Sequence, residues 1–273
     1  MIEVARLGDV TRIRMWTRRT LAAGYDVSAY VHRGILIDTG FRHVRRELEQ
    51  ALEAIRPRGV IVTHWHEDHS GNASSLARRY PVWMWGGTEE RLRAFPRVKL
   101  YRHIVWGRPR ALRDPVQPVE SVPLPLVHTP GHSFDHHVVH DPESDTLFGG
   151  DLWLGVKVRV IGREENPYQI VESLTRAIEL RPARVFDAHR GPLDNPVDAL
   201  RARRDWLQET LTAIEARLRA GDPERVILRE VLGGEELSAL VTEGEYSRRN
   251  LIRAVRSYST TGASAASSRS APR

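Results

Sequence analysis

One short segment restricts this chain more than any other, an apolar run that ends in a cluster of histidines. The run is Gly59-Val-Ile-Val-Thr63, and the letters HWHEDH follow it directly. A strand that is apolar on both faces belongs inside a sheet, and polar side chains that follow it gather at the sheet's carboxyl edge. His64 and His66 point the same way from an extended segment, while Asp68 and His69 turn toward a neighbouring position. The segment predicts a buried sheet with a metal site at its edge.

The lack of cysteine narrows the chemistry of that site. None of the 273 residues is Cys, so disulfides, thiolate ligands and thiol nucleophiles are excluded together. Any metal must be held by imidazole and carboxylate groups, which suit zinc and also manganese or iron. The chain holds only 12 histidines, so three of them within six positions are unlikely to be a chance run.

Short β-like runs alternate with helical spacings through residue 193. Strands are expected at 2–5, 12–16, 26–32, 35–38, 59–63, 82–85, 98–104, 138–140, 146–148 and 184–188. Helices are expected at 42–55, 73–79, 89–94 and 168–180, where apolar residues recur at intervals of three and four. This alternation predicts a layered α/β domain.

The character of the chain changes after Pro192. Asn195 can cap a long helix that begins at Pro196, and shorter helical pieces follow at 224–232 and 247–257. We therefore expect a catalytic domain over 1–193 and a helical extension over 194–258. The Ser/Ala-rich tail over 259–273 is expected to be disordered.

Four further motifs accompany the histidine cluster in a fixed order. They are Leu36-Ile-Asp38-Thr-Gly40 before it, and Thr129-Pro-Gly-His132-Ser, Phe148-Gly-Gly-Asp151 and Ala188-His189-Arg-Gly191 after it. Over roughly residues 10–193 this set resembles the metallo-β-lactamase superfamily. The resemblance implies an α+β fold, the αββα sandwich of two mixed β-sheets flanked by helices, here with a small helical C-terminal extension.

The resemblance also implies a dinuclear metal centre. Carried over position by position, the ligands are His64, His66 and His132 for one ion and Asp68, His69 and His189 for the other, with Asp151 between them. Asp38 would orient the ligand loop from behind. The cofactors expected are two divalent ions, Zn²⁺ first, with Mn or Fe as alternatives. Two such ions about 3.5–4 Å apart share a hydroxide that attacks a carbonyl or phosphoryl centre, and Asp68 is the catalytic group expected to orient it and handle its proton.

Other side chains near the motifs are candidates for substrate binding. Trp65 and Trp153 sit beside ligands and either line a pocket or pack in the core. Lys157 and Arg159 follow Asp151 by six and eight residues and are candidates for holding a carboxylate or phosphate. His136 is expected to be structural.

The ligand set separates this chain from several branches of the superfamily. One type of secreted lactamase needs a cysteine ligand, and another lacks the carboxylate of Asp151. Flavodiiron proteins carry Glu where His66 stands, and the long insert of β-CASP nucleases is missing. What is left resembles the glyoxalase-II-like hydrolases. We therefore predict a small-molecule hydrolase that cleaves a thioester, ester or lactone with a metal-bridging hydroxide.

The alternative is a phosphodiesterase that acts on RNA or DNA. The HWHEDHSG and HTPG motifs also resemble the lactamase-beta-2-like endoribonucleases, which carry a helical C-terminal extension. The net charge is +6, and the last helix has basic residues that can meet phosphates: Arg248, Arg249, Arg253 and Arg256. Against this, no β wing follows the helix and many glutamates surround it. The extension can equally cover the site or form a homodimer contact.

Two further expectations concern location. No run of about 18 apolar residues exists, so no segment is expected to span a membrane. The first ten residues lack a basic stretch followed by an apolar core, so no secretory signal is expected. The prediction is a cytoplasmic protein.

Overall fold

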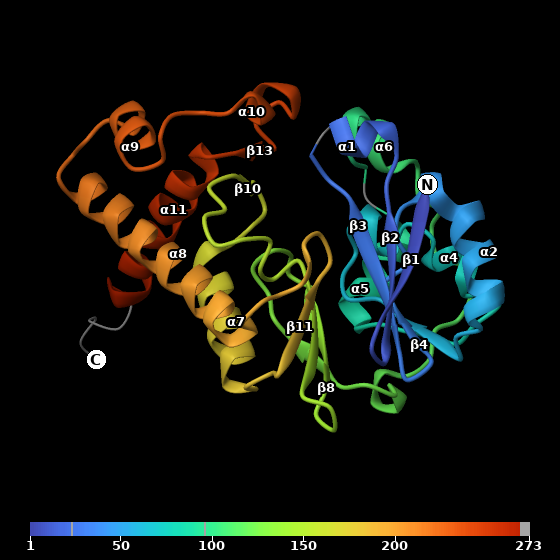
Figure 1. The fold of residues 1–273 in the computed structure, drawn as a ribbon. Coiled ribbons are helices and arrows are strands. Elements are labelled where there is room, and N and C mark those ends of the chain that lie inside the picture. Colours follow the sequence, from blue (N-terminus) through green and yellow to red (C-terminus); the bar gives the residue numbers. More distant parts are fainter. Residues whose placement is uncertain (23, 96, 268–273) are drawn as a thin grey trace, which may run out of the picture.

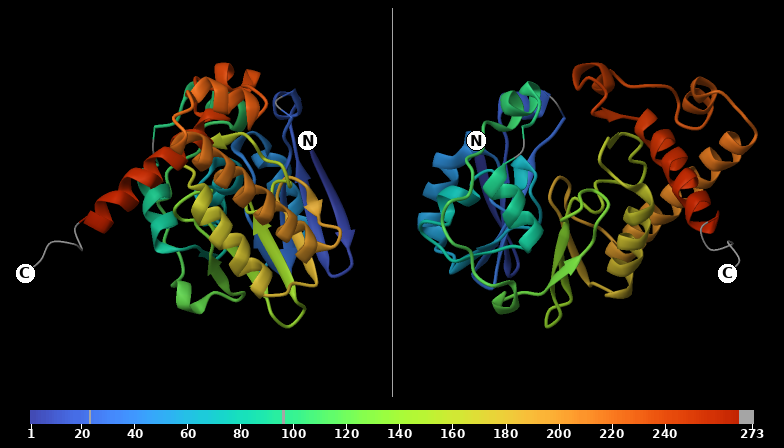
Figure 2. Two further views of the ribbon diagram at one scale, coloured as in Figure 1. Left: turned by 90° about the vertical axis from the view of Figure 1, so that its left-hand side faces the viewer. Right: turned by 180° about the vertical axis from the view of Figure 1, so that it is seen from behind.

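Two β-sheets pack face to face, with helices covering both outer surfaces (Figures 1 and 2). The structure is a computed structural model that describes residues 1–22, 24–95 and 97–267, with side chains through residue 258. Its four layers confirm the predicted α+β sandwich. No helix in these ranges is both long enough and apolar enough to cross a bilayer.

The first sheet follows the order of the chain. Its strands are β1 (Ile2–Leu7), β2 (Val10–Met15), β3 (Val27–His32), β4 (Ile35–Ile37), β5 (Gly59–Ile61) and β6 (Val82–Trp83). The strands β1 to β4 are antiparallel, whereas β4, β5 and β6 are parallel. Because β4 and β5 run the same way, their carboxyl ends bring Asp38 beside the segment that follows β5.

The second sheet has the order β12-β11-β9-β8-β7. Its strands are β7 (Leu126–His128), β8 (His137–Asp141), β9 (Thr146–Gly150), β11 (Arg184–Asp187) and β12 (Gly191–Pro192). Only β9 and β11 are parallel. These two strands end at the same edge, so Asp151 and His189 lie close together although 38 positions separate them in the sequence.

Helices and short turns of helix fill the outer layers. Before the second sheet lie α1 (Arg18–Ala22), η1 (Arg42–Val44), α2 (Arg45–Ile55), α3 (Glu67–Ser70), α4 (Ala73–Leu76), α5 (Gly86–Ala94), α6 (Leu100–Trp106) and η2 (Val119–Ser121). Later come α7 (Pro167–Glu179), α8 (Pro196–Arg219), α9 (Glu224–Glu230), α10 (Leu237–Val241) and α11 (Arg249–Ser267). A separate antiparallel pair joins β10 (Ile161–Gly162) to β13 (Tyr246–Ser247).

Three apolar clusters hold the layers together. The cluster between the sheets includes Ile61 from the first and Phe148 from the second. A second cluster packs α2 against the first sheet. The third joins the second sheet to α7, α8, α9 and α11, with Leu174 and Leu207 fully buried. Burial of each such side chain contributes about 1.5–3 kcal/mol. The third cluster thus crosses the expected boundary at residue 193, so the extension packs on the catalytic domain.

Three local expectations differ from the structure. The expected strand over 98–104 is instead the helix α6, because the first sheet ends at β6 and offers no further partner there. Asn195 precedes α8 in a left-handed conformation, but its side chain makes no capping hydrogen bond. The helix α11 runs to Ser267, where a disordered tail was expected from residue 259. The last part of that tail, 268–273, lies outside the described residues.

Candidate metal centre

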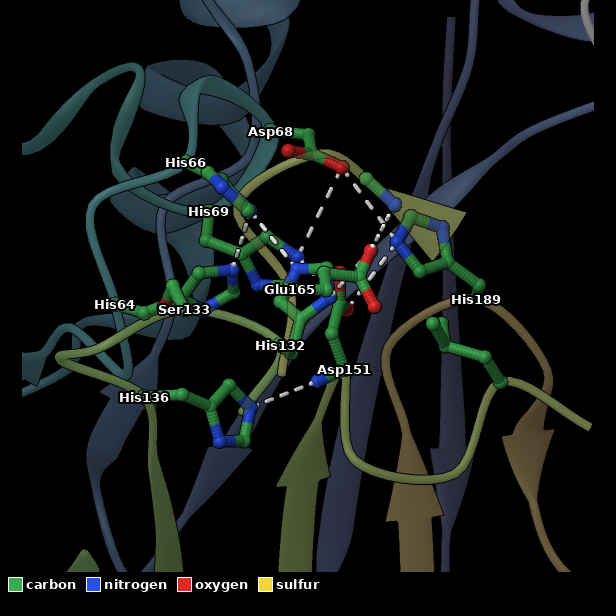
Figure 3. A network of polar contacts seen from close by, with 12 residues as sticks. His64, His66, Asp68, His69, His132, Ser133, His136, Asp151, Glu165 and His189 are labelled. Carbon is green, nitrogen blue, oxygen red and sulfur yellow. Dashed lines mark hydrogen bonds and ion pairs between the residues drawn. The ribbon is translucent and has the colours of Figure 1, made fainter. Parts of the chain in front are cut away.

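All seven predicted ligands lie at one edge of the sandwich, in segments that follow strands. Four come after β5, one after β7, and one each after β9 and β11. They form two groups that share one carboxylate, and within each group the facing atoms lie within 4.8 Å of one another. The groups are His64, His66, His132 and Asp151, and Asp68, His69, Asp151 and His189 (Figure 3).

In the first group, three imidazole nitrogens converge. His66 Nδ1 lies 3.1 Å from His64 Nε2 and 2.8 Å from His132 Nε2. His132 Nε2 is in turn 3.2 Å from Asp151 Oδ2. Nitrogens this close repel one another unless a proton or a cation lies between them, so the cluster has the form of a cation site.

The second group gathers around the other oxygen of the shared carboxylate. Asp151 Oδ1 lies 3.0 Å from His69 Nε2 and 3.3 Å from His189 Nε2. Asp68 Oδ2 is 3.5 Å from His189 Nε2. Both His69 Nε2 and Asp151 Oδ1 are buried and make no hydrogen bond. Buried polar atoms without partners are costly, and a divalent cation would satisfy these two. The donor set, imidazole plus carboxylate, is one that zinc accepts.

Three of the ligand imidazoles are held on their far side by different partners. His69 Nδ1 lies 2.7 Å from Asp38 Oδ2, and His189 Nδ1 donates to the backbone oxygen of Asp26 at 2.6 Å. His64 Nδ1 lies 3.0 Å from Thr63 Oγ1. Because these partners accept a hydrogen bond from Nδ1, the Nε2 lone pair of each ring faces the centre, as a metal ligand requires.

Asp38 joins the start and the end of the ligand segment that follows β5. Its Oδ1 accepts hydrogen bonds from the Thr63 backbone N–H at 2.8 Å and from Thr63 Oγ1 at 2.9 Å, while its Oδ2 meets His69. Asp38 has φ 64°, a left-handed conformation that is uncommon for residues other than glycine. Strain of this kind persists only where surrounding contacts fix it. These contacts support the orienting role predicted for Asp38.

The imidazoles of the site differ in their pKa values. Burial lowers the pKa of His64 and of His66 well below the usual value, and neighbouring imidazoles lower it further. Burial also opposes the charged form of His69, but the carboxylates of Asp151, Asp38 and Asp68 outweigh it and raise the pKa of His69 well above the usual value. In the first group, burial opposes the charged form of His132, but the carboxylates of Asp151 and Glu165 outweigh it and raise the pKa of His132 to about 10. Metal ligands must be unprotonated, so metal binding releases protons from both groups.

His136 is structural, as the sequence suggested. Its Nε2 accepts a hydrogen bond from the Asp151 backbone N–H at 3.0 Å, and its Nδ1 lies 3.1 Å from the Thr129 carbonyl oxygen. Gly150, which directly precedes Asp151, has φ +51°, and a Cβ at this position would lie 2.7 Å from His136 Nε2. The motif glycine therefore lets this ring approach the backbone that carries Asp151.

Two residues that support the ligands, Asp187 and Glu165, were not predicted from the sequence. Asp187 Oδ1 accepts from the backbone N–H groups of His189 and Arg190, at 2.9 and 2.8 Å. Glu165 Oε1 lies 3.6 Å from His132 Nδ1. Asp187, two positions before a ligand, was open to prediction from its place at the end of β11, but nothing in the local sequence marks Glu165.

A cavity of about 270 Å³ opens beside the first group. His66, His132 and Trp65 are among the residues that line it. Trp65 is also 4% exposed and part of the second apolar cluster, so its position agrees with both of its expected roles. The remaining walls come from the α5–α6 segment, from residues 162–165 and from residues 245–246. The cavity is thus built between the catalytic domain and the C-terminal extension.

Three of the four expected substrate residues lie elsewhere. Lys157 is exposed, and neither it nor Arg159 lines this cavity. Trp153 packs against the third apolar cluster, and its Nε1 donates to the Ala199 backbone oxygen at 2.9 Å. The physical reason is the path of the chain, which turns toward α8 after Asp151 and returns to the cavity only at residue 162.

Comparison with known proteins agrees with this geometry. Residues 26–228 match the family model described as the metallo-beta-lactamase superfamily. A beta-lactamase-like protein 2 homolog from Drosophila melanogaster is 30% identical over 181 residues, 60% of this chain and 57% of that protein. An atrochrysone carboxyl ACP thioesterase from Cryptosporiopsis sp. is 33% identical over 101 residues, 35% of this chain and 26% of that protein. The matched part of the chain spans only 50–61% of the length of the Drosophila protein and of two fungal lactamase-like proteins.

Solved structures share the fold at low sequence identity. A metallo-beta-lactamase family protein from Thermus thermophilus superposes with a TM-score of 0.66 at 19% identity and covers 95% of both chains. The DIM-1 metallo-beta-lactamase gives 0.58 at 18% identity, over 76% of this chain and 97% of its own. With the fold, the ordered motifs and the family match in agreement, this chain belongs to the metallo-β-lactamase superfamily.

Proposed function

We propose that this chain is a dinuclear metal-dependent hydrolase of small thioesters, esters or lactones. The observation that carries the proposal is the position of the cavity, which is lined by the ligands His66 and His132. A ligand that fills the cavity therefore brings one end to the metal centre. Thioesters come first in this class because relatives named as ACP thioesterases are 33% and 30% identical to parts of the chain.

The residues fit two divalent ions, with His64, His66 and His132 as ligands of one, Asp68, His69 and His189 as ligands of the other, and Asp151 between them. When bound, such ions supply an activated water at neutral pH and stabilise the charge that develops on a carbonyl oxygen. Zinc fits this donor set, and manganese or iron are the alternatives.

The remaining chemistry falls to the chain itself. Asp68 is 7% exposed, and its Oδ2 lies 3.5 Å from His189 Nε2; its carboxylate orients the attacking water and takes up its proton. Asp38 and Asp187 fix the segments that carry the ligands. Trp65 supplies an apolar wall that keeps solvent from the bound acyl group.

The test is metal content and hydrolysis measured together on wild type and Asp68→Ala. The panel contains an acyl thioester, a lactone, a phosphodiester and single-stranded RNA. We expect two metals per wild-type chain and a thioester or lactone activity that falls about 10²–10⁴-fold in the variant. Asp205→Ala, an exposed position on α8, is the matched control and should change neither value. Fewer than two metals, with no metal-dependent turnover, would exclude the proposal.

The nucleic-acid alternative finds less support. Arg248, just before α11, pairs with Glu236, while Arg249 and Arg256 on this helix lie 4.0 and 3.6 Å from Glu224. Charges paired in this way are less available to phosphates. Cleavage of RNA in the same panel, lost in Asp68→Ala and without ester activity, would favour it. The homodimer and the cytoplasmic location stay predictions.

A further inference from the structure

The cavity beside the metal centre is lined by more cations than anions. Its cationic side chains are Arg91, Arg97, Lys99, Arg102 and Arg163. These five come from α5, from the segment before α6, from α6 itself and from the loop after β10. They differ in what they already contact, and that difference separates structural cations from those available to a ligand.

Arg102 is a structural cation. It is 6% exposed, and its Nε lies 2.9 and 3.2 Å from the two carboxylate oxygens of Glu67. Its Nη1 donates to Glu245 Oε1 at 2.8 Å. Two carboxylates therefore neutralise this guanidinium, which joins the ligand-bearing helix α3 to the C-terminal extension.

Lys99 and Arg91 are also engaged. Lys99 Nζ donates to the backbone oxygen of Thr242 at 2.9 Å and lies 3.3 Å from the Glu243 carboxylate. The Arg91 guanidinium lies over the Trp65 ring, 4.7 Å from its centroid, and 3.8 Å from Glu164. Because of these contacts, we count both residues as structural parts of the cavity wall and not as cations available to a ligand.

Arg97 and Arg163 are different. Both are exposed, and within the described ranges neither takes part in an ion pair at 4.0 Å or less. The backbone of Arg163 is nonetheless fixed, since its N–H donates to the Glu245 oxygen at 2.9 Å beside the β10–β13 pair. Two uncompensated guanidinium groups thus share one cavity.

The acidic residues of the cavity do not cancel this charge. Glu245 is bound to Arg102, and Glu165 accepts from the Gly162 backbone N–H at 2.8 Å on the side that faces His132. Glu164 is 80% exposed in its side chain, and the nearest cation is Arg91. The positive charge of Arg97 and Arg163 is therefore open to a ligand.

We infer that Arg97 and Arg163 form a subsite for an anionic group, a carboxylate or a phosphate, that the substrate carries away from the bond to be hydrolysed. This inference rests on the proposed function and narrows its substrate class to anionic thioesters or esters. The fork of an arginine side chain matches both groups. The scissile carbonyl lies at the His66 and His132 end of the cavity, and Trp65 lies beside the chain that joins it to the anion.

Three thioesters of similar size test the inference and show whether the anionic group is a carboxylate or a phosphate. Butyryl-pantetheine is neutral, succinyl-pantetheine has a carboxylate on the acyl group, and butyryl-phosphopantetheine has a phosphate on the leaving group. We expect one charged thioester to exceed the neutral one in kcat/KM by about tenfold or more, since a hydrogen bond to a charged group is worth about a factor of ten. The charged thioester with the higher kcat/KM identifies the anionic group that the subsite binds.

The variants are Arg97→Gln and Arg163→Gln, with Arg46→Gln as the control. Arg46 is an exposed arginine on α2, in the outer layer of the other sheet. Each cavity variant should remove about tenfold of the preference, mainly through KM, and leave the neutral thioester within about twofold. Added salt should reduce the wild-type preference. Circular dichroism and metal content should match wild type in all three variants.

Binding of phosphopantetheine and of succinate, measured by calorimetry, gives a readout that does not depend on turnover. Weaker binding of either to Arg163→Gln than to Arg46→Gln supports the subsite. Equal rates for all three thioesters, or equal losses on the neutral one, would overturn the subsite while leaving the hydrolase proposal intact. No metal-dependent cleavage of any thioester, lactone or other ester would instead count against the hydrolase, and the calorimetry would still decide whether an anion binds.

Discussion

The metal centre and the cavity beside it touch at His66 and His132, yet they are built in different ways. Every residue of the centre follows a strand of one of the two sheets, and strand ends are fixed by the hydrogen bonds of the sheet itself. The cavity is walled by a helical segment, a loop and the C-terminal extension, which are joined by side-chain contacts and by the short β10–β13 pair. The difference suggests that the centre sets the chemistry and the cavity selects the substrate.

The largest effect expected on the centre comes from Asp151→Asn. Asp151 is common to both ligand groups, so loss of its charge weakens both sites at once. We expect metal content below two per chain and a fall in kcat of about 10³-fold or more, since metal ions supply several kcal/mol of transition-state stabilisation.

Asp145→Asn is the matched control for that variant. Asp145 is exposed and has φ 47°, a conformation that asparagine tolerates. It should keep both metals and full activity. An Asp151→Asn protein with two metals and wild-type turnover would break the division between chemistry and selection drawn above.

Among the cavity residues, Arg102 is the one whose replacement should lower the stability of the fold. Replacing it with leucine leaves Glu67 buried without a partner, because Glu67 is 0% exposed and Arg102 is its ion-pair partner. Removal of one member of a buried pair costs about 3–5 kcal/mol. We expect the free energy of unfolding to fall by that amount in Arg102→Leu, measured by urea denaturation with metals bound.

A double variant distinguishes the effect of losing the ion pair from the effect of losing side-chain packing. In Arg102→Leu with Glu67→Leu the fully buried carboxylate is removed too, and only the partly exposed Glu245 loses its partner. Part of the lost stability should therefore return. If the double variant loses as much stability, relative to wild type, as Arg102→Leu and Glu67→Leu lose together, the two side chains act independently and do not join the centre to the extension.

The same contrast explains what the sequence reveals. The seven ligands and Asp38 were predicted because each stands in a short motif at the end of a strand, where spacing alone decides which way a side chain points. The cavity was not predicted, since Arg97, Arg163 and Glu245 belong to three separate segments. Lys157 and Arg159 were expected in their place because of their closeness to Asp151 in sequence, which says nothing about the path of the intervening loop.

Helix α6 shows the same limit within secondary structure. Its residues Leu100 and Ile104 are exposed, at 72% and 48%, although their apolar character favoured a buried strand. The helix is held instead by Arg102, whose partners Glu67 and Glu245 lie 35 and 143 positions away. A contact over such a distance in sequence leaves no local pattern to read.

A smaller effect is expected at Asp38, which touches the centre only through His69 and Thr63. Asp38→Asn keeps the left-handed conformation, which asparagine adopts readily, but removes the charge that faces His69 Nδ1. Loss of such a partner typically lowers metal affinity about 10–100-fold. Competition with a chromophoric chelator should show that loss, while kcat at saturating metal stays close to wild type. The preference of the cavity for charged thioesters should be the same in Asp38→Asn and in wild type. A changed preference would mean that the centre and the cavity are coupled more tightly than their separate construction implies.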